Sequence, residues 1–163
     1  MNPFDAPDGI VVAPVGKTRE HNLRSGVFCD AGPFQARFIG LYDKKEIFAV
    51  GLIETVVERR RDGRLVTNGA ESFYPLGIED EIEEMASGFP QYAPKSASKP
   101  WYFYIVRNFP PRTSLKKSSK YGVPRTRVFS VRDLAGQDAA FEDAETLSAA
   151  LKDTTHPLGG RQQ

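Results

Sequence analysis

The sequence predicts an α+β protein, built as a small, mostly antiparallel β-barrel with two or three short flanking helices. Five or six β-prone runs are joined mainly by connections of hairpin length, of which 43–45 is the clearest. The helical stretches are few and short. They do not alternate with the strands as helices of about 10–15 residues, which disfavours a doubly wound parallel sheet.

The N-terminal half reads as strands arranged around two tight turns. Residues 10–15 form a first strand, and 17–24 form one or two helical turns that Gly26 ends. A β-hairpin follows, with arms at 35–42 and 46–58. The Asp-Gly pair at 62–63 predicts a further tight turn and a third strand that ends near residue 67.

The C-terminal half mixes short helices with two strands. Acidic residues crowd the first turn of the helix at 79–87, where the helix dipole stabilises them. The later elements are an extended linker, two strongly β-prone runs, a helical turn and a closing amphipathic helix. The linker contains Pro90, Pro94 and Pro100. The two β-prone runs are 101–107 and 126–131, the helical turn is 132–135, and the closing helix is 141–151.

The chain of 163 residues is expected to form one domain over 10–153, with a flexible arm at 1–9 and a flexible tail at 154–163. No apolar run approaches the roughly 20 residues of a membrane span, and the N-terminus lacks the basic and apolar segments of a signal peptide. Cys29 is the single cysteine, which excludes a disulfide framework. These features predict a cytoplasmic protein without membrane contact.

The net charge of +1 hides a strong segregation of charge along the chain. Residues 85–132 contain ten Lys and Arg side chains and no Asp or Glu, whereas both flanking segments are acidic. The same segment holds nine of the 18 aromatic residues. Cations bind phosphates and aromatic rings stack on bases, so this segment predicts binding of a nucleic acid or a nucleotide.

The long connection at 109–127 is the best candidate for that surface, because long ordered loops are usually functional. Its basic and hydroxyl side chains are those that contact phosphate, and nearby aromatic residues could line a base pocket. The predicted phosphate or nucleic-acid ligands are Arg112, Thr113, Lys116, Lys117, Ser118, Lys120, Arg125 and Arg127. The predicted base pocket consists of Trp101, Tyr102, Tyr104 and Tyr121.

The sequence contains no recognisable catalytic or metal-binding motif. His21 and His156 have no partner at a catalytic spacing, and Cys29 follows apolar residues, as a packing cysteine does. We therefore expect no cofactor, no metal site and a noncatalytic role. Two alternatives stay open: an interaction subunit that docks an acidic protein partner through its basic face, and a small-molecule enzyme without a recognisable motif.

The hairpin at 37–56 resembles the central hairpin of the PUA-like superfamily, which includes the ASCH and EVE domains. The shared pattern is a strand ending in an aromatic residue, a turn, and a strand of apolar residues interrupted by Ala49 and Gly51. The resemblance implies a small β-barrel that binds RNA or a modified base and is noncatalytic in most members. The ASCH pattern Gly-x-Lys-x-x-Glu is only approximated from Gly16 to Glu20, where the glutamate comes one residue early, so Lys17 and Glu20 are not counted as site residues.

Overall fold

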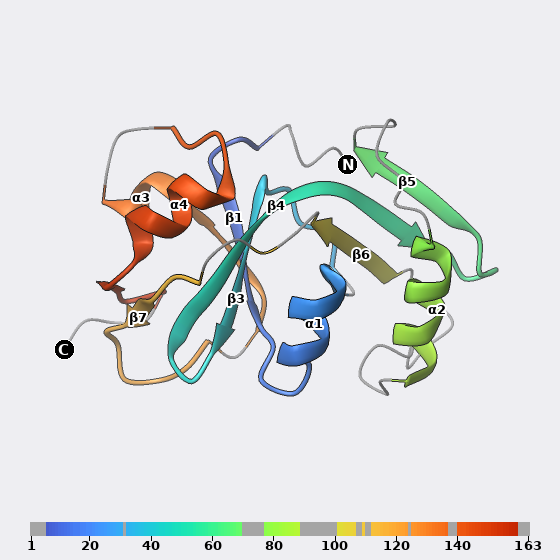
Figure 1. Cartoon of the computed structure of the whole chain (residues 1–163), viewed down its shortest axis with the longest axis horizontal. Helices are drawn as coiled ribbons and strands as arrows, with labels where there is room; N and C mark the ends of the chain where they lie inside the picture. Colours follow the sequence, from blue (N-terminus) through green and yellow to red (C-terminus); the bar gives the residue numbers. More distant parts are fainter. Residues whose placement is uncertain are drawn as a thin grey trace.

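A computed structural model gives the fold (Figure 1), and it describes residues 6–30, 32–69, 77–88, 101–106, 109, 112–123, 125–136 and 140–159. Nine strands and four helices occur in this part of the chain. In chain order they are β1 (Gly9–Pro14), α1 (Arg19–Ser25), β2 (Val27–Asp30), β3 (Phe38–Asp43), β4 (Glu46–Arg59), β5 (Leu65–Gly69), α2 (Ile78–Gly88), β6 (Trp101–Val106), β7 (Leu115–Lys117), β8 (Arg127–Ser130), α3 (Val131–Ala135), α4 (Ala144–Leu151) and β9 (Thr154–His156).

The predicted hairpin is present as β3 and β4. Its turn consists of Lys44 and Lys45, which both adopt left-handed backbone conformations with φ of 50° and 63°. Two consecutive positive φ angles are what a two-residue turn of the hairpin type requires. The antiparallel register runs from Asp43 opposite Glu46 to Phe38 opposite Leu52, with an irregularity after Leu41.

The sheet is mostly antiparallel, as expected, but its ladder does not close into a barrel. Its main path runs β2-β6-β4-β3-β1-β8, and β1–β3 and β7–β9 are the parallel pairs within the described strands. The two end strands, β2 and β8, share no ladder there. They are instead linked at one point, where the Thr126 hydroxyl donates a hydrogen bond of 2.7 Å to the Asp30 carboxylate. We call this open edge the seam.

Apolar side chains pack on both faces of the curled sheet. Inside the curl, Val11, Ile39 and Tyr104 are buried in one cluster. The outer face on the β1 side packs against α3 and α4, whereas the outer face of β2 and β6 packs against α2 (Figure 1). Because residues of one strand alternate between faces, β1, β3 and β4 are buried on both sides and form the centre of the domain.

Three short strands lie where the sequence predicted none, and the first of them is β2 at 27–30, which pairs with β6. Residues 115–117, within the expected loop, form β7, which pairs with the beginning of β4. Residues 154–156, expected in the flexible tail, form β9, which pairs with β7. The predicted linker at Pro90, Pro94 and Pro100, and three of the basic residues (Lys95, Lys99 and Arg107), lie outside the described residues.

Candidate functional site

A hollow lies at the beginning of α1, where the chain leaves β1. It consists of two adjoining pockets of 640 Å³ and 450 Å³ that share the backbone and side chains of Gly16, Lys17 and Thr18. The larger pocket extends along α1 to Arg24, and the smaller one extends to the seam at Asp30 and Thr126. We call the two together the α1 cleft, and the pockets its outer and inner parts.

The turn at 15–18 holds the shared wall in one conformation. The Val15 amide donates to the Tyr42 carbonyl at 2.9 Å, and the Thr18 amide donates back to the Val15 carbonyl at 2.9 Å. The buried Thr18 hydroxyl donates to the Asn22 amide oxygen at 2.7 Å, and the Asn22 side chain in turn donates to Val27 at 2.8 Å. The backbone around Lys17 is therefore fixed, while the Lys17 side chain is exposed to solvent.

Several charged side chains in the outer part of the cleft are held by contacts within the protein. Arg19 forms an ion pair with Asp43 at 3.3 Å and lies 4.0 Å above the ring of Phe48. A second chain of contacts runs from Arg24 to the buried His21 at 3.3 Å. His21 continues the chain to Glu81 of α2, also at 3.3 Å. These contacts fix the α1 wall, whereas Lys17 and Lys44 line the same pocket without an ion pair to any described residue.

The inner part of the cleft is different, because it combines cations, an aromatic ring and an oriented carboxylate. Lys17 and Arg125 line it, and neither forms an ion pair with any residue in the described part of the chain. Trp101, at the beginning of β6, is half-buried and forms another part of the wall. The same pocket thus offers positive charge and a ring on which a planar group can stack.

The Asp30 carboxylate at the seam is held from two sides. One oxygen accepts the Thr126 hydroxyl at 2.7 Å, and the other accepts the Gly32 amide at 3.0 Å. Each carboxylate oxygen can accept two hydrogen bonds, so both retain capacity for a further donor. Two acceptors fixed side by side suit a ligand edge that carries adjacent N–H groups.

Cys29 also lines the inner part, but as an unreactive thiol. Burial raises the pKa of this thiol well above its usual value, and the negative charge of Asp30 raises it further. The thiolate is the nucleophilic form of cysteine. Cys29 is therefore protonated at neutral pH and contributes an apolar surface rather than a reactive group.

Two of the predicted site residues, Trp101 and Arg125, come together in the inner part of the cleft. Three others are buried for structural reasons. Tyr104 is 0% exposed, and its hydroxyl donates to the Gly32 carbonyl at 3.0 Å, so it is a core residue and not part of a base pocket. Thr113 is buried with its hydroxyl bound to Ser148 at 2.7 Å, and it presents no group to phosphate.

Lys117 is the third. Its side chain lies inside the β7 region at 7% exposure and donates to the Ser119 hydroxyl. Desolvation lowers the pKa of this ammonium group, and the neighbouring Lys45 lowers it further. A lysine held in this way is not available to an external phosphate. It is an internal donor of the β7–β9 region.

The remaining predicted residues lie outside the cleft. Tyr121 is 73% exposed, and the Lys120 ammonium lies 5.4 Å from the centre of its ring. Arg127, the first residue of β8, lies over the ring of Phe129 at 5.6 Å. Arg112, Lys116 and Ser118 are exposed, and Tyr102 is half-buried. The predicted loop is therefore partly a basic surface and partly interior.

Sequence reasoning missed Thr18 and Asp30 as parts of a site, and it set Lys17 aside because the ASCH pattern is only approximated from Gly16 to Glu20. The available signal was the run Gly16-Lys17-Thr18 between the first strand and the first helix, which combines a flexible residue, a cation and a hydroxyl. Asp30 gave no local signal, because its role depends on Thr126, which is 96 residues away in sequence.

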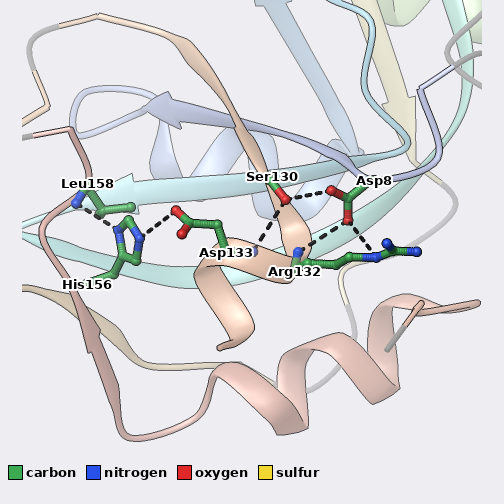
Figure 2. Close-up of polar contacts among 6 residues, drawn as sticks. All are labelled: Asp8, Ser130, Arg132, Asp133, His156 and Leu158. Atoms are coloured by element: carbon green, nitrogen blue, oxygen red, sulfur yellow. Dashed lines mark hydrogen bonds and ion pairs between the residues drawn. The ribbon is translucent and has the colours of Figure 1, made fainter. Parts of the chain in front are cut away.

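A second polar cluster joins α3 to the chain ends and resembles a catalytic arrangement at first sight (Figure 2). The Leu158 amide donates to Nδ1 of His156 at 2.9 Å, so the ring proton lies on Nε2, which contacts Asp133 at 2.9 Å. Ser130 donates its proton to Asp8 at 2.5 Å and not to the histidine. Since both ring nitrogens are occupied, the cluster caps α3 and anchors β9 and provides no general base.

No helix within the described residues is long and apolar enough to cross a bilayer. The same residues contain no group of three or more His, Cys, Asp or Glu side chains that could hold a metal ion.

Comparison with known proteins gives one similar structure. No family model matches the sequence, and no curated protein matches it. The structure is similar to the crystal structure of ASCH from Zymomonas mobilis, with a TM-score of 0.42 and 11% sequence identity, over 90% of this chain and 98% of the other.

Proposed function

We propose that this chain is a cytoplasmic, noncatalytic module that binds a nucleic acid or a nucleotide, including one with a modified base, in the inner part of the α1 cleft. The observation that carries the proposal is that Trp101 and two cations, Lys17 and Arg125, which form no ion pair with the described residues, surround one pocket of 450 Å³. That volume is within the roughly 300–1,000 Å³ of small-ligand sites.

Each group has a distinct role in this proposal. Lys17 and Arg125 neutralise a phosphate, and the Trp101 ring stacks on the base. The oriented oxygens of Asp30 accept hydrogen bonds from amino or imino groups on the edge of the base. The exposed cations of the 112–120 segment then add contacts to the backbone of a longer ligand, as the charge of the sequence predicts.

The site carries its own optical probe, because Trp101 is the single tryptophan of the chain. We would titrate the protein with AMP, CMP, GMP and UMP, and with short oligonucleotides, while following tryptophan fluorescence. Stacking on Trp101 quenches or shifts this emission. Replacing Trp101 by Phe preserves a stacking surface, and binding of that variant is followed by calorimetry.

The decisive comparison uses single charge removals. Lys17→Ala and Arg125→Ala each remove a phosphate contact and should weaken mononucleotide binding by about tenfold, since hydrogen bonds to charged groups contribute about 1.5–3 kcal/mol. Lys116→Ala is the matched control, because it removes an exposed lysine on β7 outside the cleft. If the two cleft variants bind mononucleotides as tightly as the control does, or if no nucleotide or oligonucleotide binds at all, the proposal is wrong.

A further inference from the structure

A second concentration of positive charge lies at the tip of the β4–β5 hairpin. Residues 59–64 contain four arginines and Asp62, in the half of the chain whose overall charge is acidic. Arg60, Arg61 and Arg64 line a pocket of 360 Å³ at this tip, together with Glu58 and Asp62. We call residues 60–64 the arginine turn. In Figure 1 the hairpin lies on the α2 side of the molecule, away from α3 and α4.

The backbone of the arginine turn is fixed by its own hydrogen bonds. The Arg60 amide donates to the Arg64 carbonyl, and the Gly63 amide donates to the Arg60 carbonyl, both at 2.9 Å. The Asp62 carboxylate accepts the Arg64 amide at 2.9 Å, so part of its capacity is used within the turn. Gly63 adopts a φ of +84°, which completes the reversal. The guanidinium groups therefore project from a rigid support.

The hairpin is also anchored at its base. Arg59 Nε contacts Glu83 of α2 at 3.2 Å, which joins the last residue of β4 to the helix. Beyond this residue the side chains at 60–64 are exposed, and the Arg60 side chain is 44% exposed with Glu58 at 3.9 Å from its Nε atom. Arg64 forms no side-chain ion pair within the part of the chain that the structure describes. Its guanidinium is available to a ligand.

The strand register places this turn next to the α1 cleft. Arg59 lies opposite Trp101 in the β4–β6 ladder, and Leu65 lies opposite Arg59 in the β4–β5 ladder. Neighbouring strands are about 4.8 Å apart. The wall of the inner cleft and the arginine turn therefore share one end of the sheet, one strand apart, although they are distant in sequence.

We propose that the arginine turn is a second binding site, for the phosphodiester groups of a single strand that leaves the α1 cleft past Trp101, an inference that rests on the proposed function. Arginine is suited to this role because its planar guanidinium binds phosphate oxygens through two parallel hydrogen bonds, and the turn contains arginine and no lysine. A mononucleotide held in the cleft does not reach the turn, whereas a longer strand does. The turn therefore contributes to affinity only for oligonucleotides.

The test compares UMP with fluorescein-labelled oligonucleotides of 16 uridines or 16 thymidines. In the double variant Arg60→Gln/Arg64→Gln, we expect affinity for both 16-mers to fall by about tenfold or more at low salt. The slope of log affinity against log salt should become shallower by about 1.4, because each phosphate contact to a single strand contributes about 0.7. Affinity for UMP should stay at the wild-type value.

The control is Arg132→Gln/Lys152→Gln, which removes two exposed cations, one on α3 and one directly after α4, on the side of the molecule away from the arginine turn, and changes the net charge by the same amount. Circular dichroism spectra and melting temperatures equal to those of the wild type verify that both variants fold. The inference is overturned if the arginine variant binds both 16-mers as the wild type does, if the control loses as much affinity, or if the loss is confined to RNA, which would assign the turn to the 2′-hydroxyl.

The same data separate this inference from the proposed function. If the wild type binds the 16-mers but no mononucleotide, the cleft proposal fails, and the arginine variant still decides the role of the turn. If the wild type binds UMP and the arginine variant retains full affinity for the 16-mers, the cleft proposal stands and the turn proposal fails. Absence of all oligonucleotide binding to the wild type overturns both.

Discussion

The seam between β2 and β8 offers the sharpest test of how the sheet is held in its curled form. Within the described strands no ladder joins these two edges, and the bond from the Thr126 hydroxyl to Asp30 connects them at 2.7 Å. Thr126→Val removes the hydroxyl and retains the shape of the side chain. The lost bond has a charged acceptor, and such bonds contribute about 1.5–3 kcal/mol.

Part of that stabilisation survives in the variant, because Asp30 retains its 3.0 Å bond from the Gly32 amide and both side chains are only half-buried. We therefore expect the free energy of unfolding to fall by about 1–2 kcal/mol. With a slope near 2 kcal/mol per molar urea, the unfolding midpoint should move down by about 0.5–1 M. A urea titration that is monitored by circular dichroism measures this midpoint.

Thr155→Val is the matched control, since Thr155 is an exposed threonine on β9 without a side-chain hydrogen bond in the described structure. Valine is as compatible with a strand as threonine, so this change should leave the midpoint within about 0.2 M. Equal midpoints for Thr126→Val and Thr155→Val would refute the reasoning. The two edges would then be held together by packing alone.

Three further outcomes are expected from single groups. Tyr104→Phe removes a hydroxyl that bonds the Gly32 carbonyl and the Phe34 amide, and it should lower the free energy of unfolding by about 1–3 kcal/mol in the same urea assay. The N-cap hydrogen bonds from Thr146 lower the pKa of Asp143 in the folded protein. The contribution of this carboxylate to stability is therefore present above its unfolded pKa near 4 and is lost as the pH falls through the lower folded pKa. The melting temperatures of the wild type and of Asp143→Asn should converge as the pH is lowered. Cys29 should react with a thiol reagent such as dithionitrobenzoate at pH 8 only after urea unfolds the chain, and rapid labelling of the folded protein would contradict its buried, protonated state.

Local chemistry explains which elements could be predicted from the sequence. The β3–β4 hairpin was predictable because the short polar segment 43–45 lies between two long apolar runs, and Gly26 was a visible end to α1. β7 could not be predicted in this way. It has three residues, two of them lysines, in a segment rich in serine and lysine, and it is a strand only because β4 and β9 pair with it.

The candidate site was only partly predictable for a similar reason. The charge of 85–132 led to Arg125, and the aromatic content led to Trp101. The other walls come from the β1–α1 turn and from β2, and only the fold brings these segments together. Composition also could not distinguish Lys117, whose side chain is buried, from Lys116, whose side chain is exposed, since alternation along a three-residue strand decides between them.

The length of β4 has a consequence for how the molecule unfolds. This strand of 14 residues pairs with β3 over its first half, with β5 and β6 over its second half, and with β7 at its beginning. Its partners therefore come from both the N-terminal and the C-terminal parts of the chain, and four of the eight ladders in the described part of the structure include it. Amide hydrogens along β4 should exchange with solvent only through global unfolding, as one cooperative unit. Because these pairings span large sequence separations, folding should be slow for a chain of this size, with the ordering of β4 as its common step.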